Sequence, residues 1–518
     1  MPLTTKQKAL KQFNEAKMNK KKYPTREDWE KLAADLTFPH QAFIGGEYLD
    51  ALSGETFACE SPIDGRILTQ VASCDTTDAD RAVKAARTSF ESCLWRYLPP
   101  AKRKQILLKF ADLIAANKDE LALLETLDMG KPIRFSSSVD VGGTARVIRW
   151  TAEAIDKVYG EVAPTPANQI GMITREAVGV VVAIVPGNFP LLMASWKFAP
   201  ALAMGNSVIL KPSEKSPLTA LRIAGLAKEA GIPDGVFNVL PGFGTRVGKA
   251  LAQHMDVDTL AFTGSTAVAK KLMVYAGESN MKRVWLEAGG KSPNIVFADA
   301  PNLEKAAEAA AQGIAFNMGQ VCTAGTRLLV EASIKDEFVA LVNKALAKWQ
   351  PGHPLDPATL NGAIVDKQQL TKVLGYIEKG QQEGAHLSAG GEQLFEASGG
   401  YYVQPTVFTE AKNTMQIAAE EIFGPVLSVL TFDTIEDAIN QANATVYGLA
   451  AAVWTADLNK AHKTAKALRA GSVWINNYDG GDMTAPFGGY KQSGNGRDKS
   501  LHAFDKYTEI KATWLSLE

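Results

Sequence analysis

Residues 178–214 read VGVVVAIVPGNFPLLMASWKFAPALAMGNSVILKPSE. An apolar, β-branched run at Val178–Val185 comes first, a helical pattern follows at Leu191–Met204, and a second apolar run occupies Ser207–Leu210. A buried strand, a helix and another buried strand are typical of a parallel sheet covered by helices. The apolar character is interrupted by Pro186, Gly187, Asn188, Pro190 and Lys197, so this order explains the stretch better than a membrane span does.

The same alternation continues in both directions from this stretch. Downstream to residue 286 we expect helices at Pro217–Ala230, Thr245–His254 and Ser265–Gly277 and strands at Val236–Leu240, Thr259–Phe262 and Arg283–Leu286. Upstream we expect a strand with a glycine turn at Phe43–Tyr48 and helices at Asp78–Phe90 and Pro100–Met129. Alternating short strands and helices predict an α/β fold with a doubly wound sheet, whose carboxyl edge is where a dinucleotide would bind.

A second alternating set runs from a strand at Asn294–Phe297 to a strand at Ser472–Asn476. Its expected helices are Asn302–Phe316, Ile334–Trp349, Lys367–Gln382, Ile435–Ala444 and Leu458–Leu468. Two segments fit neither set: a polar hairpin pattern at Val158–Thr174 and an alternating run at Tyr507–Leu517. Because an exposed strand edge invites pairing, we expect these two segments to be offered to another subunit.

Composition narrows the class of protein. The chain has 518 residues, 46% of them hydrophobic and 21% charged, which is typical of a globular protein of about three domains. The net charge of −1 gives no global attraction to nucleic acid or to an anionic membrane. Four cysteines without CxxC spacing, scattered histidines and a Lys-rich start without an apolar signal core favour a cytoplasmic protein with no structural metal.

Cys322 is the candidate nucleophile. It lies among small residues in FNMGQVCTAG (316–325), 35 positions after Glu287 in LEAGGK (286–291). A thiol can attack a carbonyl carbon, and a carboxylate beside a Gly-Gly turn can serve as its base or activate a water. The alternative is that Cys322 is a small core side chain.

Other polar residues follow strands. Asn188, in PGNFP (186–190), could donate to an oxyanion together with the Cys322 N–H, or it could be a turn residue. Glu214, in KPSE (211–214), could accept bonds from ribose hydroxyls and would repel a 2′-phosphate, which favours NAD over NADP. Ser265, in FTGST (262–266), could place a phosphate at a helix N-terminus or be an ordinary cap.

Two further motifs point to a cofactor. The spacing Gly-Phe-Gly-x-x-x-Gly at 242–248 is a weak phosphate-loop signal. In EIFGP (421–425), Phe423 could stack on a nicotinamide ring and Glu421 could accept from ribose, although a strand start with a core Phe would also explain the sequence.

Together these residues resemble the NAD(P)-dependent aldehyde dehydrogenase superfamily from about residue 38 to the C-terminus. The markers occur in the family's order: PGNFP, KPSE, FTGST, LEAGGKSP (286–293), GQVC (319–322), EEIFGPV (420–426) and PFGGYKQSG (486–494). The resemblance implies two doubly wound parallel-sheet domains plus a small β oligomerisation element. The implied boundaries are a helical arm at 1–36, an NAD-binding domain at 37–156 and 178–289, a catalytic domain at 290–491, and an oligomerisation element at 157–177 and 506–518.

The resemblance also implies roles. Cys322 would attack the aldehyde, Asn188 would hold the oxyanion, NAD would accept the hydride, and Glu287 would activate the water that hydrolyses the thioester, with Lys197 near the water path. Implied cofactor contacts are Val185, Pro186, Gly187, Lys211, Ser213, Glu214, Gly244, Gly248, Phe262, Ser265, Leu286, Glu421 and Phe423. The family further implies a homodimer or homotetramer and, because Glu287 is present, a free carboxylic acid product.

The C-terminal runs NYDGGDMT (477–484) and KQSGNGRDKSLHAFDKYTEIK (491–511) look like those of γ-glutamyl-γ-aminobutyraldehyde and guanidinobutyraldehyde dehydrogenases of polyamine catabolism. We therefore expect an ω-amino or acylamino aldehyde as substrate. Its charged end would meet acidic residues and its chain an apolar sleeve. The candidate residues are Asp128, Asp479 and Asp482 for the charged end, and Phe189, Trp196 and Phe487 for the sleeve.

Two positions depart from the family pattern: Gly187 stands where most members have Trp, and Asp498 stands where many have Glu. The first leaves space beside the cofactor loop, and the second shortens a carboxylate. Three alternatives stay open at this point: a general or betaine-type aldehyde dehydrogenase, a cofactor-independent cysteine esterase, and a catalytically silent scaffold.

Overall fold

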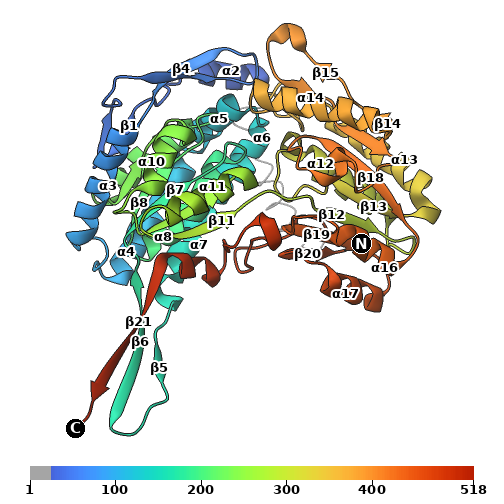
Figure 1. The fold of residues 1–518 in the computed structure, drawn as a ribbon. Helices are drawn as coiled ribbons and strands as arrows, with labels where there is room; N and C mark the ends of the chain where they lie inside the picture. The colour runs from blue at the N-terminus through green and yellow to red at the C-terminus, as the bar shows by residue number, and fades with distance from the viewer. Residues whose placement is uncertain (1–24) are drawn as a thin grey trace, which may run out of the picture.

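The computed structural model describes residues 25–518 and has two lobes, each built on a seven-stranded sheet, with a narrow three-stranded sheet projecting from one lobe (Figure 1). Lys6 to Lys22 of the predicted N-terminal arm lie outside the described residues. Within them, helix α2 (Arg26–Ala34) begins at Thr25, whose side chain accepts from the Asp28 N–H while Asp28 accepts from the Thr25 N–H, a reciprocal N-terminal cap.

Five consecutive strands of the first sheet, β11, β10, β7, β8 and β9, are parallel. Its order is β11-β10-β7-β8-β9-β1-β2, and only β1 and β2 run antiparallel to their neighbours. The strands are β1 (Ala42–Ile44), β2 (Glu47–Leu49), β7 (Val180–Ile184), β8 (Ser207–Lys211), β9 (Phe237–Val239), β10 (Thr259–Thr263) and β11 (Arg283–Glu287).

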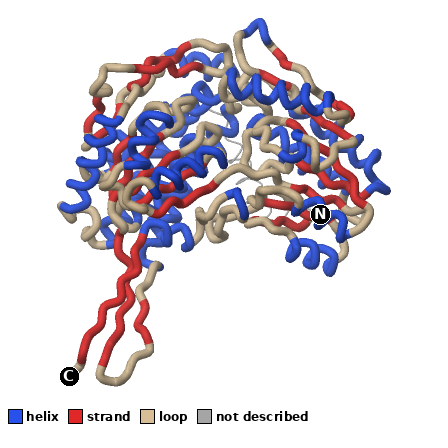
Figure 2. The backbone as a smooth tube through the Cα atoms, in the orientation of Figure 1, coloured by secondary structure: helices blue, strands red, loops and turns tan. Residues whose placement is uncertain are grey.

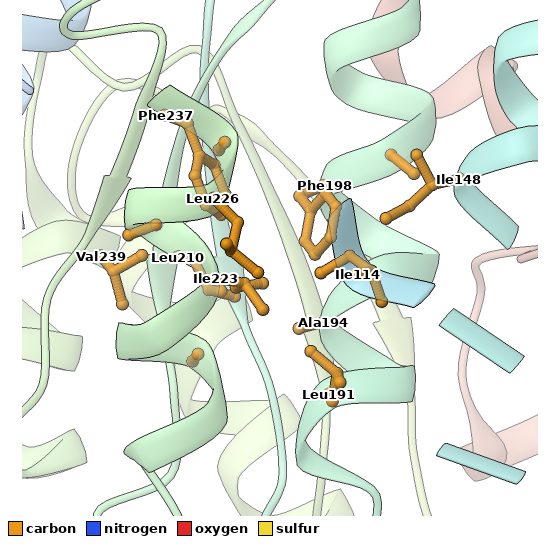
Figure 3. Packing of buried hydrophobic residues seen from close by; sticks show 14 of the residues in the cluster. Ile114, Ile148, Leu191, Ala194, Phe198, Leu210, Ile223, Leu226, Phe237 and Val239 are labelled. Atoms are coloured by element: carbon orange, nitrogen blue, oxygen red, sulfur yellow. The ribbon is translucent and has the colours of Figure 1, made fainter. Parts of the chain in front are cut away.

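Both faces of this sheet are covered. Val181 and Ala183 of β7 belong to one buried cluster, and the alternate residues Val180 and Val182 belong to another, as expected where side chains of a strand point to opposite faces. Figure 3 shows the first cluster, with Phe198 lying between Ile114 and the residues around Leu210. The helices on that side are α4 (Pro100–Ala116), α5 (Lys118–Met129), α7 (Gly142–Ala154), α8 (Pro190–Ala203) and α9 (Leu218–Ala230). The other side carries α3 (Thr76–Glu91), α10 (Lys249–Gln253) and α11 (Thr266–Gly277).

The second sheet has the order β14-β17-β18-β13-β12-β19-β20 and is parallel except for β14. Its strands are β12 (Pro293–Val296), β13 (Arg327–Glu331), β14 (His386–Ala389), β17 (Thr406–Thr409), β18 (Val426–Phe432), β19 (Ala450–Trp454) and β20 (Ser472–Ile475). Its helices are α12 (Leu303–Ala315) and α13 (Lys335–Leu346) on one face, and α14 (Lys367–Gln382), α15 (Gln416–Ala419), α16 (Ile435–Asn443) and α17 (Leu458–Ala467) on the other. The predicted α/β class with two doubly wound sheets is confirmed.

The projecting sheet has the order β21-β6-β5 and is antiparallel throughout, as the tube in Figure 2 also shows. Its strands are β5 (Glu161–Ala163), β6 (Gln169–Ala177) and β21 (Thr508–Ser516). The two segments that fit neither alternating set therefore pair with each other. Two small hairpins complete the sheets: β3 (Thr56–Glu60) with β4 (Ile67–Ala72), and β15 (Gln393–Leu394) with β16 (Tyr402–Val403).

Two helix predictions were wrong in detail. The helix expected over 100–129 is two helices, because Asn117 leaves the helical conformation and its side chain donates to the Leu113 carbonyl. The helix expected over 245–254 begins as a π-helical turn at Gly244–Gly248 and becomes α-helical only in α10. Within residues 25–518 we find no helix long and apolar enough to cross a membrane.

Candidate active site

A cavity of about 740 Å³ lies where loops of the two large sheets meet. Its wall joins Asn188 and Glu287, which follow or end strands of the first sheet, to Cys322 and Glu421 from the second lobe. The wall also contains other predicted site residues, namely Pro186, Phe189, Trp196, Ser265, Phe423, Asp479, Asp482 and Phe487. The structure therefore brings most of the predicted site together from segments up to about 300 residues apart in sequence.

Glycine lets the Cys322 loop approach the Glu287 loop. A Cβ on Gly290 would lie 2.4 Å from the Cys322 carbonyl oxygen, a distance that real Cβ atoms do not adopt. The chain before the cysteine is left-handed at Asn317, Met318 and Gly319, with φ of 50°, 56° and 69°. This unusual run turns the chain sharply out of α12 and holds Cys322 at the cavity wall.

Glu421 locks the same turn from the other side. Its carboxylate accepts the Gly290 N–H at 3.1 Å, and a Cβ on Gly289 would lie 2.1 Å from it. Phe423, two residues later, adopts a left-handed φ of 59°, which is costly for a bulky side chain and places it in the cavity wall.

Asn188 lies beside the cysteine loop. Its side-chain amide donates to the Gln320 carbonyl at 2.8 Å. The backbone carbonyl of Asn188 accepts from the side-chain amide of Asn317 at 2.9 Å. An amide NH₂ has two N–H groups, so one donor remains for a ligand. Within residues 25–518, the Cys322 N–H donates to no protein acceptor, which leaves a second donor at the same place.

The Cys322 thiol is held in its neutral form by its surroundings. Burial raises the pKa of Cys322 to about 12, and the carboxylates of Glu421, Asp479 and Glu287 act in the same direction, while a hydrogen bond from the Thr323 backbone opposes them. A nearby positive charge would therefore be needed to make this thiol a nucleophile at neutral pH.

Glu287 is buried, and neither of its carboxylate oxygens has a hydrogen-bond partner in the described part of the chain. Burial raises the pKa of Glu287, and the charge of Asp498 raises it further, while Lys197, Lys506 and Arg497 lower it. An unpartnered carboxyl group in a cavity wall can accept a proton from a water there.

Lys197 does not line the cavity. It is buried in α8, and its ammonium group contacts the Asp498 carboxylate at 2.5 Å. Asp498 does line the cavity, so Lys197 influences the cavity through its contact with Asp498. The shorter carboxylate at this position is thus part of a buried ion-pair cluster.

Comparison with known proteins gives the family. Residues 48–513 match the Aldehyde dehydrogenase family. The chain belongs to the aldehyde dehydrogenase family.

Three relatives illustrate the match. The NADP/NAD-dependent aldehyde dehydrogenase PuuC of Escherichia coli (strain K12) is 56% identical over 490 residues, which are 95% of this chain and 98% of that protein. An indole-3-acetaldehyde dehydrogenase solved with NAD+ is 68% identical, with a TM-score of 0.95, over 95% of this chain and 100% of that one. A gamma-glutamyl-gamma-aminobutyraldehyde dehydrogenase of Burkholderia cenocepacia J2315 is 58% identical, with a TM-score of 0.94, over the same shares of the two chains.

Several predicted cofactor residues of this aldehyde dehydrogenase lie at the carboxyl edge of the first sheet, whereas Glu421 and Phe423 come from the second lobe. Lys211 ends β8 and pairs with Glu214 at 3.1 Å. Burial opposes ionisation of Glu214, but Lys211, a backbone hydrogen bond and Lys215 together outweigh it and lower the pKa of this carboxyl. Ser265 lines the cavity and caps α11, accepting from the Val268 N–H at 3.3 Å, so the N-terminus of that helix begins at the cavity wall. An ionised carboxylate and a helix N-terminus at one sheet edge fit a dinucleotide.

Several predicted cofactor residues, Lys211 and Glu214 among them, do not line the cavity. They are Val185, Gly187, Lys211, Ser213, Glu214, Gly244, Gly248, Phe262 and Leu286. Gly244 and Gly248 have open space where a Cβ would be, so a ligand can approach their backbone. At Gly187 the space expected from the missing indole is partly filled, because the Ser216 hydroxyl donates to the Gly187 carbonyl at 3.1 Å and lies 2.8 Å from where a Cβ would be.

The part of the cavity beyond Cys322 is apolar on one side and charged on the other. Trp196 packs edge-on against Phe487 with ring centroids 5.2 Å apart. Asp479 accepts from the Thr323 hydroxyl at 3.3 Å, and Asp482 is exposed. Lys499, which sequence reasoning missed, lines the same wall with its ammonium group 5.3 Å from the centre of the Trp196 ring. The wall beyond the cysteine thus presents two carboxylates and one ammonium group.

Asp128 was placed wrongly in the tunnel. It is fully buried in α5, where its carboxylate accepts from the Leu218 N–H at 2.8 Å and from the Cys59 thiol at 3.0 Å. Burial raises its pKa to about 7. Its side chain faces α9 and the β3–β4 hairpin rather than the cavity, and sequence alone did not show which face of the helix it occupies.

Proposed function

We propose that this aldehyde dehydrogenase uses NAD to oxidise an ω-amino, guanidino or γ-glutamylamino aldehyde of polyamine catabolism to the carboxylic acid. The observation that supports the substrate class is the cavity wall, where Asp479 and Asp482 lie on the same cavity as Cys322 and Glu287. A carboxylate pair stabilises an ammonium or guanidinium end, and the apolar sleeve takes the carbon chain.

The proposed chemistry begins at sulfur. The Cys322 thiolate attacks the aldehyde carbon, and the new oxyanion receives the free N–H of the Asn188 amide and the Cys322 N–H. When bound, NAD supplies the acceptor for the hydride that leaves this carbon. Glu287 then removes a proton from water, the water oxygen bonds to the thioester carbon, and the carbon–sulfur bond breaks to release the acid and the Cys322 thiolate.

Lys211, Glu214 and Ser265 are proposed to hold the dinucleotide, with Glu421 and Phe423 beside its nicotinamide end. The ionised Glu214 disfavours a 2′-phosphate, so we expect NAD to be preferred over NADP. Residues 37–156 and 178–289 form the proposed NAD-binding domain, and residues 290–491 form the proposed catalytic domain.

The relatives point to two substrate classes. One acts on an aldehyde with a γ-glutamylamino end and another on indole-3-acetaldehyde. The aromatic sleeve of Trp196 and Phe487 would accept an indole, whereas Asp479 and Asp482 favour a cationic end. We favour the aldehyde with a cationic end, because an apolar ligand gains nothing from two carboxylates.

The test is NADH formation with a panel of aldehydes: acetaldehyde, betaine aldehyde, 3-aminopropanal, 4-aminobutanal, 4-guanidinobutanal, γ-glutamyl-γ-aminobutyraldehyde and indole-3-acetaldehyde. We expect the highest kcat/KM for the amino-ended substrates and no NADH formation with Cys322→Ala. Asp482→Asn should lower kcat/KM for 4-aminobutanal by about two- to fivefold and leave acetaldehyde unchanged. Asp336→Asn, which alters a carboxylate outside the cavity, is the matched control.

Equal kcat/KM for charged and uncharged aldehydes of the same length would contradict the substrate proposal. Ester hydrolysis without any aldehyde oxidation would favour the esterase alternative. We further propose a homodimer or homotetramer joined through 157–177 and 506–518, working in the cytoplasm, where the four unpaired thiols would stay reduced.

A further inference from the structure

Asp498 is held between two buried lysines. Lys197 of α8 contacts one carboxylate oxygen at 2.5 Å, and Lys506 contacts the other. All three side chains are at most 2% exposed. Lys506 belongs to the 3-10 segment Leu501–Tyr507, which packs against α8 just before β21. A single lysine would neutralise Asp498, so the second ammonium group has a further consequence.

The second ammonium group changes the net charge of the buried cluster beside Glu287. Asp498 raises the pKa of Glu287, whereas Lys197, Lys506 and Arg497 lower it. Arg497 is half-buried and donates to the Gly489 and Gly496 carbonyls, and the Cys322 thiol also faces Glu287. Without Lys506, the buried pair Lys197–Asp498 is neutral. With Lys506, the buried cluster carries one excess positive charge, which ionised Glu287 balances.

Burial makes this balance matter. Glu287 has no hydrogen-bond donor of its own in the described chain, so nothing but surrounding charge stabilises its ionised form. In a buried site the charge of a neighbouring group is screened far less than in water. Burial lowers the pKa of Lys506 and Asp498 counters it, while burial opposes ionisation of Asp498 but the two lysines outweigh it. Each partner thus favours the charged form of the other.

We propose that Lys506 is a positioning residue for the deacylation step: it fixes Asp498 on its far side and supplies positive charge that favours the ionised form of Glu287, the form that takes a proton from water. This inference rests on the role of Glu287 in the proposed function. The competing explanation is that Lys506 only ties the segment 501–507 to α8, which would change stability without changing the ionisation of Glu287.

The test uses p-nitrophenyl acetate with saturating NAD: the nicotinamide cation favours the Cys322 thiolate, and the ester carries no hydride to transfer. The thiolate attacks the ester carbon and the bond to nitrophenolate breaks, giving a burst; water then hydrolyses the thioester, giving the steady rate. The variants are Lys506→Gln, which can still donate a hydrogen bond to Asp498 but has no charge, and Lys506→Arg, which keeps the charge. Lys463→Met, which removes a lysine from an exposed pair with Glu436, is the matched control.

We expect Lys506→Gln to keep the burst and to move the acid limb of the steady-rate pH profile upward by about one pH unit or more. At a pH on the acid limb this corresponds to a loss of about tenfold in the steady rate. Lys506→Arg should stay close to the wild-type profile. In the double variant Asp498→Asn with Lys506→Gln, Lys197 again leaves one excess positive charge, so the limb should return toward the wild-type position.

The inference is overturned if the limb of folded Lys506→Gln stays in place, or if the double variant keeps its shift. Thermal melting shows whether Lys506→Gln folds. If it does not, the steady-rate pH profile of the double variant is compared with that of the wild type. An acid limb raised by one pH unit or more in the double variant contradicts the proposal. A wild-type chain that shows neither a burst nor aldehyde oxidation would instead remove the proposed function itself.

Discussion

At the residue scale, the Cys322 thiol lies in a buried wall among the carboxylates of Glu421, Asp479 and Glu287. Each of these charges disfavours a thiolate, and burial disfavours it most. The surroundings of Cys322 therefore favour the neutral thiol, and we propose that a cation brought with the cofactor would favour the thiolate.

This gives a pH prediction for alkylation. Because the pKa of Cys322 is raised to about 12, the thiolate is a small fraction at neutral pH, and that fraction grows about tenfold for each pH unit. We expect the rate of iodoacetamide labelling at Cys322, measured by peptide mass spectrometry, to rise steadily from pH 6 to pH 10. Added NAD should raise the rate at a fixed pH near 7.

The experiment is best done with Cys93→Ser, since Cys93 is the other partly exposed thiol and Cys59 and Cys74 are buried. A labelling rate that levels off below pH 9 without cofactor would show that the thiol is ionised by the protein alone, contrary to this account.

At the element scale, the site depends on loops that touch backbone to backbone. Gly290 meets the Cys322 carbonyl, and a Cβ on Gly319 would lie 2.2 Å from the Gly424 carbonyl carbon. These contacts explain why GG and GQVC stand beside the reactive residues, because any side chain there would push apart the loops that carry Cys322, Glu287 and Glu421.

Gly290→Ala should therefore lower kcat/KM for any aldehyde by at least about tenfold, since a shift of the order of 1 Å at reacting groups is enough to cost that much. The matched control is Gly375→Ala in α14, where nothing lies within 4 Å of the added Cβ. There we expect normal kinetics and a stability gain of about 0.5–1 kcal/mol. Equal kinetics for the two variants would mean that the close approach at Gly290 is not needed.

Periodicity predicted the elements well where packing follows it. The β-branched run of β7 and the apolar pattern of α8 lie where expected, since both faces of the sheet are covered and the chain must bury them. It failed at Asn117, where a side-chain hydrogen bond ends α4 in an otherwise continuous helical pattern. The hairpin of β3 and β4 was not foreseen, because its alternation is short and half exposed.

The site was predictable to the extent that strand ends and glycines signal it. Asn188 and Glu287 follow or end strands of the first sheet, and the structure brings both to the cavity. Asp128 could not be placed, because in a helix buried all round no periodicity tells which face meets the ligand. Lys499 and Lys506 were not singled out, because a lysine in a charged C-terminal run is usually a solvated one.

At the scale of the whole molecule, the three-stranded sheet extends away from both lobes (Figure 1). It exposes large apolar side chains, including Ile510 and Trp514 on β21, which are 66% and 64% exposed. Strand β20 lies at the edge of the second sheet. An exposed apolar sheet, and separately an unpaired strand edge on the second sheet, favour pairing between copies of the chain.

Charge placed on this sheet should break the proposed assembly. We expect Ile510→Asp with Trp514→Asp to lower the molar mass measured by light scattering, from that of a dimer or tetramer to that of a smaller species. Val446→Asp, which changes an exposed apolar residue elsewhere, is the control and should leave the mass unchanged. A wild-type chain that is monomeric at micromolar concentration would contradict the oligomerisation proposal.

The measurement that tests the central claim most directly is intact and peptide mass spectrometry of Glu287→Gln mixed with 4-aminobutanal and NAD. The amide cannot take a proton from water, so the acyl group should stay on sulfur. We predict one acyl group per chain, located on the Cys322 peptide, together with a single turnover of NADH and rapid loss of the adduct in the wild-type chain. NADH formed by Glu287→Gln at the wild-type steady rate, with no adduct on Cys322, would contradict the covalent mechanism proposed for this cavity.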